Sequence, residues 1–268
     1  MPMSVEVHLS FGWSGLRLAG SLHLPSGVGP YPAVLMAQGS GPADRDSGGY
    51  FVPIRQAFID RGIATFAFDK PGCGESSGNW RHYALEGRAD QAVAALGHVR
   101  NHPAITSKRV GIWGHSQGGW LVQKLASRSL DLAFAIASSG PTIGVREQIP
   151  YDCEHTLRNQ GYNDREIRDA LTLTRELQQA ATEGADFESI SSRLLTPASR
   201  TPWYSSYPTV DDADDWEHFK LLLGEPFEPL SALGSADCPF LAVYGGLDHL
   251  LPPWRGAHPG RSVLWGWS

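Results

Sequence analysis

The sequence lacks the features of a disulfide-stabilised, metal-binding or membrane-spanning protein. Its 268 residues include only three cysteines, Cys73, Cys153 and Cys238, which are scattered and do not have metal-ligand spacing. They predict isolated reduced thiols. No apolar run is long enough to span a membrane, and no basic segment followed by an apolar stretch stands near residue 1. We therefore expect a protein without a signal peptide, in the cytoplasm.

An excess of positive charge is also missing. The formal net charge is −6 and the isoelectric point is near 5.9. Nucleic acids and anionic membrane surfaces attract basic proteins, so we expect neither as a main partner. The length suits one large domain with an inserted section.

Apolar runs alternate with segments of helical spacing along most of the chain. Two strands at 5–10 and 16–24 predict an antiparallel hairpin, and helices are predicted at 51–61 and 83–101. Further buried strands are predicted at 31–37, 63–68, 109–113, 132–137 and 239–244. This order is typical of an α/β fold, in which a mostly parallel sheet has helices on both faces.

The alternation stops between residues 141 and 230, where three helical segments follow one another at 145–160, 164–182 and 187–195. We predict a core formed by residues 1–140 and 231–268, with residues 141–230 inserted as a helical cap. The alternative is that these helices pack against the flank of the sheet. Four aromatic residues are expected to line an apolar pocket under the cap: Trp203, Tyr204, Tyr207 and Trp216.

The segment Gly114-His115-Ser116-Gln117-Gly118 lies between the predicted strand at 109–113 and a helix that begins near Trp120. A serine on a sharp turn between a strand and a helix is the nucleophile-elbow arrangement. It predicts that Ser116 is a nucleophile and that the backbone N–H of Gln117 points into the same space. The alternative is a glycine-rich turn without chemistry.

The loops that follow two other strands also carry candidate residues. After the strand at 31–37, Gly39 and Gly41 leave the backbone free to turn its N–H groups towards a substrate. The N–H of Ser40 is the expected partner of the Gln117 N–H in an oxyanion hole. Arg45 is expected to brace this loop.

The loop at 69–78 is rich in glycine but lacks the residue order of a phosphate-binding loop, so we expect it to pack under the loop at 38–46. Asp248 follows the last predicted strand, where the acid of a Ser-Asp-His triad stands in chain order. It would orient an imidazole and stabilise its charged form. The alternative is a solvated turn aspartate.

Taken together, residues 38–46, 69–76 and 114–119 resemble the α/β-hydrolase superfamily. They are most similar to bacterial serine carboxylesterases related to dienelactone hydrolases and to the acylaminoacyl-peptidase-like group. Gln38 departs from the family, which usually has histidine there. The resemblance implies an eight-stranded sheet, a Ser-Asp-His triad, small-molecule ester substrates, and neither a cofactor nor a metal.

The histidine of the triad is the least determined residue. The family places it several tens of residues after the acid, beyond a helix and a strand, whereas 20 residues follow Asp248. His258 is our candidate, with His249 and His115 as weaker ones and no competent base as the remaining alternative. The tail has tryptophans among glycine and proline, and we expect from this a shortened or frame-shifted C-terminus.

These features predict a serine hydrolase that cleaves carboxylic esters through an acyl-enzyme on Ser116. A peptidase or a C–C hydrolase on the same fold is one alternative. A catalytically impaired homologue that binds acyl ligands is another. The sequence leaves the natural substrate and the oligomeric state open.

Overall fold

The computed structural model describes residues 4–128, 130–207, 210–245 and, as backbone, 263–267. Its single sheet has eight strands in the order β1-β2-β4-β3-β5-β6-β7-β8. The strands are β1 (Val5–Trp13), β2 (Leu16–Leu24), β3 (Tyr31–Ala37), β4 (Ala64–Phe68), β5 (Ile105–His115), β6 (Ala135–Ser138), β7 (Phe240–Gly245) and β8 (Val263–Trp267). β1 and β2 pair antiparallel, β2 pairs antiparallel with β4, and every other neighbouring pair is parallel.

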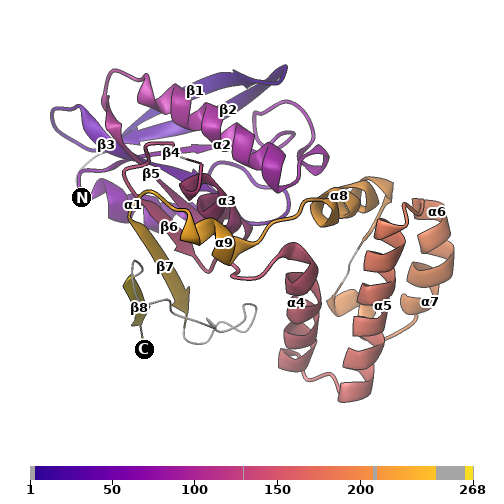
Figure 1. The fold of residues 1–268 in the computed structure, drawn as a ribbon. Helices are drawn as coiled ribbons and strands as arrows, with labels where there is room; N and C mark the ends of the chain where they lie inside the picture. The colour runs from indigo at the N-terminus through magenta and orange to yellow at the C-terminus, as the bar shows by residue number, and fades with distance from the viewer. Residues whose placement is uncertain (1–3, 129, 208–209, 246–262, 268) are drawn as a thin grey trace.

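Helices cover both faces of the sheet, as the sequence predicts (Figure 1). Those of the core are α1 (Phe51–Ile59), the short η1 (Trp80–His82), α2 (Leu85–Arg100), α3 (Gln117–Ala126) and α9 (Pro229–Gly234). β3 shows how the two faces are built. Ala33, Leu35 and Ala37 belong to the core cluster that includes α2 and α3, whereas Val34 and Met36 pack with Phe51 of α1. Successive side chains of a strand point to opposite faces, so a continuous apolar run supplies both layers.

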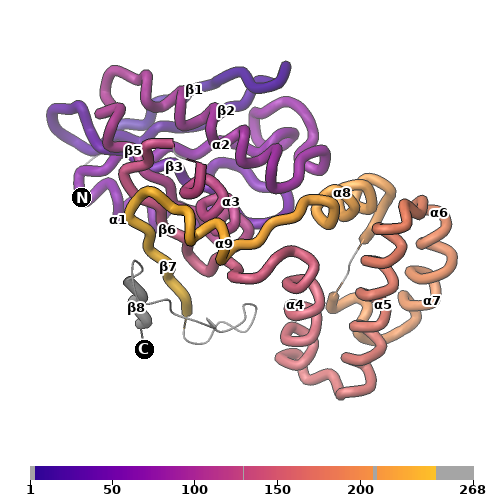
Figure 2. The backbone as a smooth tube through the Cα atoms, in the orientation of Figure 1, coloured from indigo at the N-terminus to yellow at the C-terminus, as the bar shows by residue number. Residues whose placement is uncertain are grey.

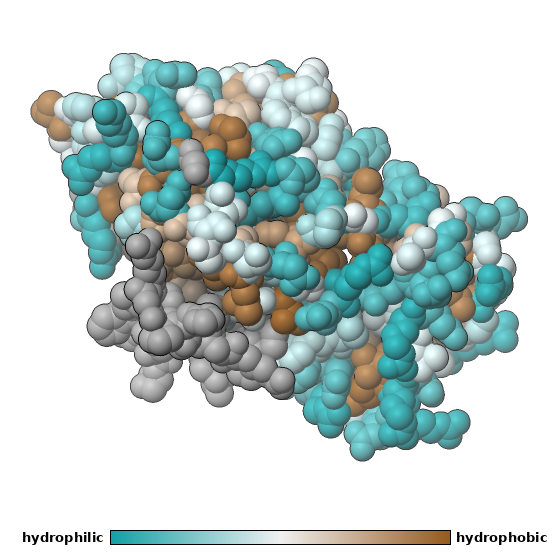
Figure 3. All heavy atoms as spheres, viewed as in Figure 1, coloured by the Kyte–Doolittle hydropathy of each residue, from teal (hydrophilic) through white to brown (hydrophobic). Residues whose placement is uncertain are grey.

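The chain leaves the sheet after β6 and returns to it at β7 through a helical section beside the sheet (Figure 2). This section contains α4 (Val145–Asn159), α5 (Asp164–Thr182), α6 (Phe187–Ile190), the π-helix η2 (Ser191–Leu195), α7 (Thr196–Ala198), η3 (Tyr204–Ser206) and α8 (Ala213–Gly224). The face of this section that Figure 3 shows is mostly hydrophilic. The three helical segments predicted from the sequence correspond to α4, α5 and the run from α6 to η2.

Two tryptophans of this section were expected to line a pocket, and that expectation is wrong. Trp216 is fully buried, and its indole N–H donates to the carbonyl oxygen of Ala185 at 2.7 Å. Trp203 is 3% exposed. Aromatic residues of a small helical unit are its largest source of buried apolar area, so both rings pack inside it.

Polar contacts join the helical section to the core. The Arg81 guanidinium of η1 donates to Asp215 of α8 at 2.5 Å, and His218 Nδ1 lies 2.8 Å from the carbonyl oxygen of Arg81. The His218 ring also meets the Trp80 ring edge to face at 4.9 Å. Thus α8 lies against the loop that follows β4. None of the described helices is both long and apolar enough to cross a membrane.

Replacing Trp216 by alanine should lower the free energy of unfolding by about 3–5 kcal/mol, because a fully buried indole leaves a large cavity. Urea denaturation followed by circular dichroism would measure it. Leu221→Ala in the same helix is the matched control, since Leu221 is 45% exposed and its loss should cost little. Similar losses in both variants would show that Trp216 does not stabilise the section.

Candidate active site

Ser116 lies between β5 and α3, so the predicted strand–turn–helix context is confirmed. Its backbone has φ 54° and ψ −121°, a conformation that side-chain-bearing residues rarely adopt. Backbone hydrogen bonds hold it there. The Ser116 N–H donates to Ser138 at 3.0 Å, and the Ser116 carbonyl oxygen accepts from Gly119 at 2.7 Å.

Glycines surround Ser116 because backbones touch at this turn. A Cβ atom on Gly118 would overlap the carbonyl oxygen of Ala37, and one on Gly114 would overlap the carbonyl oxygen of Gly118. Gly119 meets Gly140 in the same way. The strained turn therefore packs directly against β3 on one side and against the segment that follows β6 on the other.

Ser116, Gly39 and Ser40 share one surface cleft of about 550 Å³, which the β3–α1 loop (residues 38–50) lines along one side. A Cβ atom on Gly39 would lie 3.4 Å from the Ser116 Cβ and 3.8 Å from its Oγ. The structure therefore brings these three predicted residues together. His115 also lines the cleft and packs against the Tyr50 ring at 4.6 Å. Asp248, His249 and His258 lie outside the described residues.

Arg45 braces the β3–α1 loop, as predicted, by pairing with the loop that follows β4. Its guanidinium lies 2.5 Å from Asp69 and 2.6 Å from Glu75. Asp69 is buried, which opposes its ionisation, yet hydrogen bonds from Arg45 hold its pKa below the ordinary value. These contacts of Arg45 confirm the prediction that residues 69–78 pack under the β3–α1 loop. The hydrogen bonds of Lys70 to the same loop, described next, confirm it as well.

Lys70 is a buried lysine whose role the sequence did not indicate. It is 3% exposed, and its Nζ donates to the carbonyl oxygens of Gly39 at 2.6 Å and Gly41 at 2.5 Å. Burial, helped by repulsion from Arg88, lowers the pKa of Lys70 to about 6. Nearby Cys73 raises the pKa of Lys70 and so opposes this shift. His218 lines the same small pocket as Lys70.

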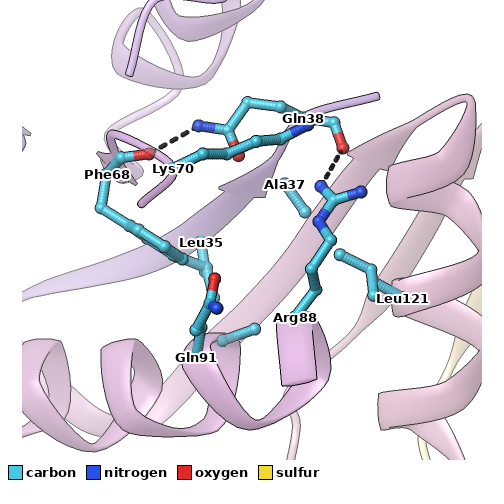
Figure 4. Close-up of a pocket in the computed structure, with 9 residues that line it drawn as sticks. Leu35, Ala37, Gln38, Phe68, Lys70, Arg88, Gln91 and Leu121 are labelled. Atoms are coloured by element: carbon cyan, nitrogen blue, oxygen red, sulfur yellow. Dashed lines mark hydrogen bonds between the residues drawn. The ribbon is translucent and has the colours of Figure 1, made fainter. Parts of the chain in front are cut away.

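Arg88 of α2 is the second missed residue. Its guanidinium donates to the carbonyl oxygen of Gln38 at 2.8 Å (Figure 4). It also donates to the side-chain oxygen of Gln117. The Gln38 amide in turn donates to the Phe68 carbonyl oxygen at 2.5 Å. Burial lowers the pKa of Arg88 to about 10, so it stays charged at neutral pH. Arg88 thus joins the β3–α1 loop to the first residue of α3.

The arrangement suits attack by a hydroxyl on a carbonyl group. Ser116 stands at the N-terminus of a ten-residue helix, whose free backbone N–H groups favour negative charge. Backbone of the β3–α1 loop, at Gly39, lies close to its Oγ.

Comparisons with known proteins find similar sequences among esterases. A family model described as "Esterase FrsA-like" matches residues 2–149, just over half of the chain. Esterase FrsA of Escherichia coli O139:H28 is 32% identical over 243 residues, and that of Klebsiella pneumoniae is 28% identical over 243 residues. These alignments cover 87% and 88% of this chain. The chain spans about half of each relative, since 54% of each is covered.

Among solved structures, the alpha/beta hydrolase GrgF of Penicillium matches with a TM-score of 0.59 at 19% sequence identity. The match covers 98% of this chain and 90% of GrgF. With the strand order described above, it confirms the predicted α/β-hydrolase fold.

Replacing Gly118 by alanine should destabilise the protein by about 3 kcal/mol, because the new methyl group overlaps the backbone of β3. Thermal and urea unfolding would measure the loss. Gly97→Ala in α2 is the matched control, since no atom lies within 4 Å of its added Cβ. That change should stabilise the helix by up to about 1 kcal/mol. Equal effects at the two positions would contradict the tight turn.

The stability of the wild type should rise with pH relative to Lys70→Met. Lys70 has a pKa of about 6 when folded and 10.5 as its ordinary value, so the unfolded chain binds more protons between these values. The free energy of unfolding of the wild type, relative to that of the variant, should therefore rise by up to about 1.4 kcal/mol per pH unit from pH 6 to 9. It should fall by the same amount as the pH is lowered again. Urea denaturation of both proteins at each pH would measure this difference. Parallel curves would contradict the shifted pKa.

Proposed function

Because the chain belongs to the FrsA-like esterase family, we propose that it cleaves carboxylic ester bonds through an acyl-enzyme on Ser116. The observation that carries this proposal is the position of Ser116. It combines a strained strand-to-helix turn, a place in an open cleft, and the backbone of Gly39 beside its hydroxyl.

In the proposed reaction, the Ser116 Oγ attacks the ester carbonyl carbon while a base takes its proton. We assign the base to His258 and its orienting acid to Asp248, both on the sequence pattern. The oxyanion is held by the backbone N–H groups of Ser40 and Gln117. Collapse of the intermediate expels the alcohol, which takes the proton from the histidine. A water molecule then hydrolyses the acyl-enzyme by the same steps and restores the serine.

We propose a small-molecule ester as substrate, with residues 141–230 as a cap over one end of the sheet. The contacts of α8 with the segment at 80–82 support that placement, because this segment belongs to the loop that follows β4. Ligands of open parallel sheets bind outside the carboxyl ends of the strands, where such loops lie. A cytoplasmic location and the absence of nucleic-acid and membrane partners stay predictions from the sequence.

Turnover of p-nitrophenyl acetate and butyrate would test the proposal. The wild type should hydrolyse these esters, and Ser116→Ala should lower kcat at least about 10³-fold, because it removes the nucleophile. Ser127→Ala, at the end of the same helix, is the matched control and should keep the wild-type rate. A fluorophosphonate probe should label the wild type and not Ser116→Ala.

Equal turnover by the wild type and Ser116→Ala would overturn the assignment of the nucleophile. A wild type that neither turns over esters nor reacts with the probe would instead support the catalytically impaired homologue.

A further inference from the structure

We propose that Lys70 and Arg88 are positioning residues that aim the oxyanion-hole N–H groups at the cleft: Lys70 holds the carbonyl of the peptide unit that carries the Ser40 N–H, and Arg88 holds the neighbouring Gln38 carbonyl together with the Gln117 side chain. This inference rests on the proposed function and extends it to two buried side chains outside the cleft. It concerns peptide orientation in the β3–α1 loop and at the start of α3.

The geometry of one peptide unit carries the argument for Lys70. The carbonyl of Gly39 and the N–H of Ser40 belong to a single peptide, which is planar and trans, so the two groups point in opposite directions. Lys70 Nζ holds the Gly39 oxygen at 2.6 Å from inside the protein. The Ser40 N–H is therefore turned outward, to the side on which Ser40 lines the cleft.

Lys70 also fixes the far side of the same turn. Its second bond, 2.5 Å to the Gly41 oxygen, holds the peptide unit between Gly41 and Pro42, so the backbone around Ser40 is anchored on both sides. Glycines at positions 39 and 41 make such rotation easy when the backbone is not held. An amine has two N–H donors even when it is neutral, so both bonds persist in either protonation state of Lys70.

Arg88 links the two halves of the proposed oxyanion hole. One nitrogen of its guanidinium holds the Gln38 carbonyl oxygen at 2.8 Å, and another holds the side chain of Gln117, the residue that supplies the second N–H donor. A planar guanidinium places its donors in a fixed fork, so it sets the spacing of the two segments as well as their direction. Both side chains are buried, at 3% exposure for Lys70 and 8% for Arg88.

Neither Lys70 nor Arg88 is among the residues that line the cleft with Ser116. They would therefore change the transition state through the peptides they hold, and would leave the binding of the ground-state ester nearly unaffected. Holding a peptide carbonyl with a buried donor also polarises the peptide, which strengthens its N–H as a donor.

The test compares Lys70→Met with the wild type on p-nitrophenyl butyrate. We expect kcat to fall about 10–100-fold while KM changes less than about threefold, because a misaimed oxyanion donor weakens the transition state alone. The inhibition constant of a boronic acid, whose adduct with serine is tetrahedral, should weaken by the same factor as kcat. Lys70→Arg, which keeps N–H donors, should retain more of kcat than Lys70→Met.

Lys124→Met is the matched control. Lys124 lies in α3, the helix that follows the elbow, and its amine pairs with Glu86 of α2 at 2.6 Å. This variant should behave as the wild type. If Lys70→Met fails to fold, Arg88→Lys carries the test with the same expected split between kcat and KM, because one amine cannot reproduce the fork.

The inference falls if the Lys70 variant, or Arg88→Lys in its place, keeps kcat within about twofold of the control. It also falls if KM alone changes, or if kcat falls while boronic acid inhibition stays constant. A wild type without turnover or probe labelling would instead overturn the proposed function, and the positioning role with it. The two failures are therefore distinguishable by the wild type alone.

Discussion

The contact of backbone with backbone beneath Ser116 is the constraint on which the site depends. The turn can lie against β3 only if Gly118 carries no side chain, and it can fold sharply only if Gly114 carries none. That closeness brings the Ser116 hydroxyl next to the Gly39 backbone. The serine conformation, the proximity of the β3–α1 loop and the cleft between them therefore have a common origin in the packing of β3, β5 and α3.

Close packing places the segments but leaves their peptide planes free to rotate, and buried polar groups remove that freedom. Arg45 with Asp69, Lys70 with the carbonyls of Gly39 and Gly41, and Arg88 act at successive points of one loop. Burying such groups is costly unless they are paired, so each bond holds the loop firmly. The lowered pKa values of Lys70 and Arg88 reflect that cost of burial.

The sequence predicts those features that depend only on residues close together in the chain. Apolar runs marked the strands, and the spacing of Gly114, Ser116 and Gly118 marked the elbow, because a turn needs only its neighbours to be recognised. Boundaries were less accurate: β5 begins at Ile105, where it pairs with Tyr31, a contact that only the sheet register determines. Arg88 was placed in a helix but not recognised as buried, since Gln38 lies 50 residues away. Trp216 was misplaced because an aromatic residue fits a cap core as well as a pocket wall.

The anchoring of the β3–α1 loop from beneath has a consequence for how such a protein can diversify. Ser40 and Pro42 face the cleft, whereas the groups that hold the adjoining backbone come from α2 and from the loop between β4 and α2. Side chains on the open side can therefore be exchanged without disturbing the bonds that set the loop's shape. New substrate preferences could be selected, in nature or in a library of cleft variants, while the reactive geometry is inherited unchanged.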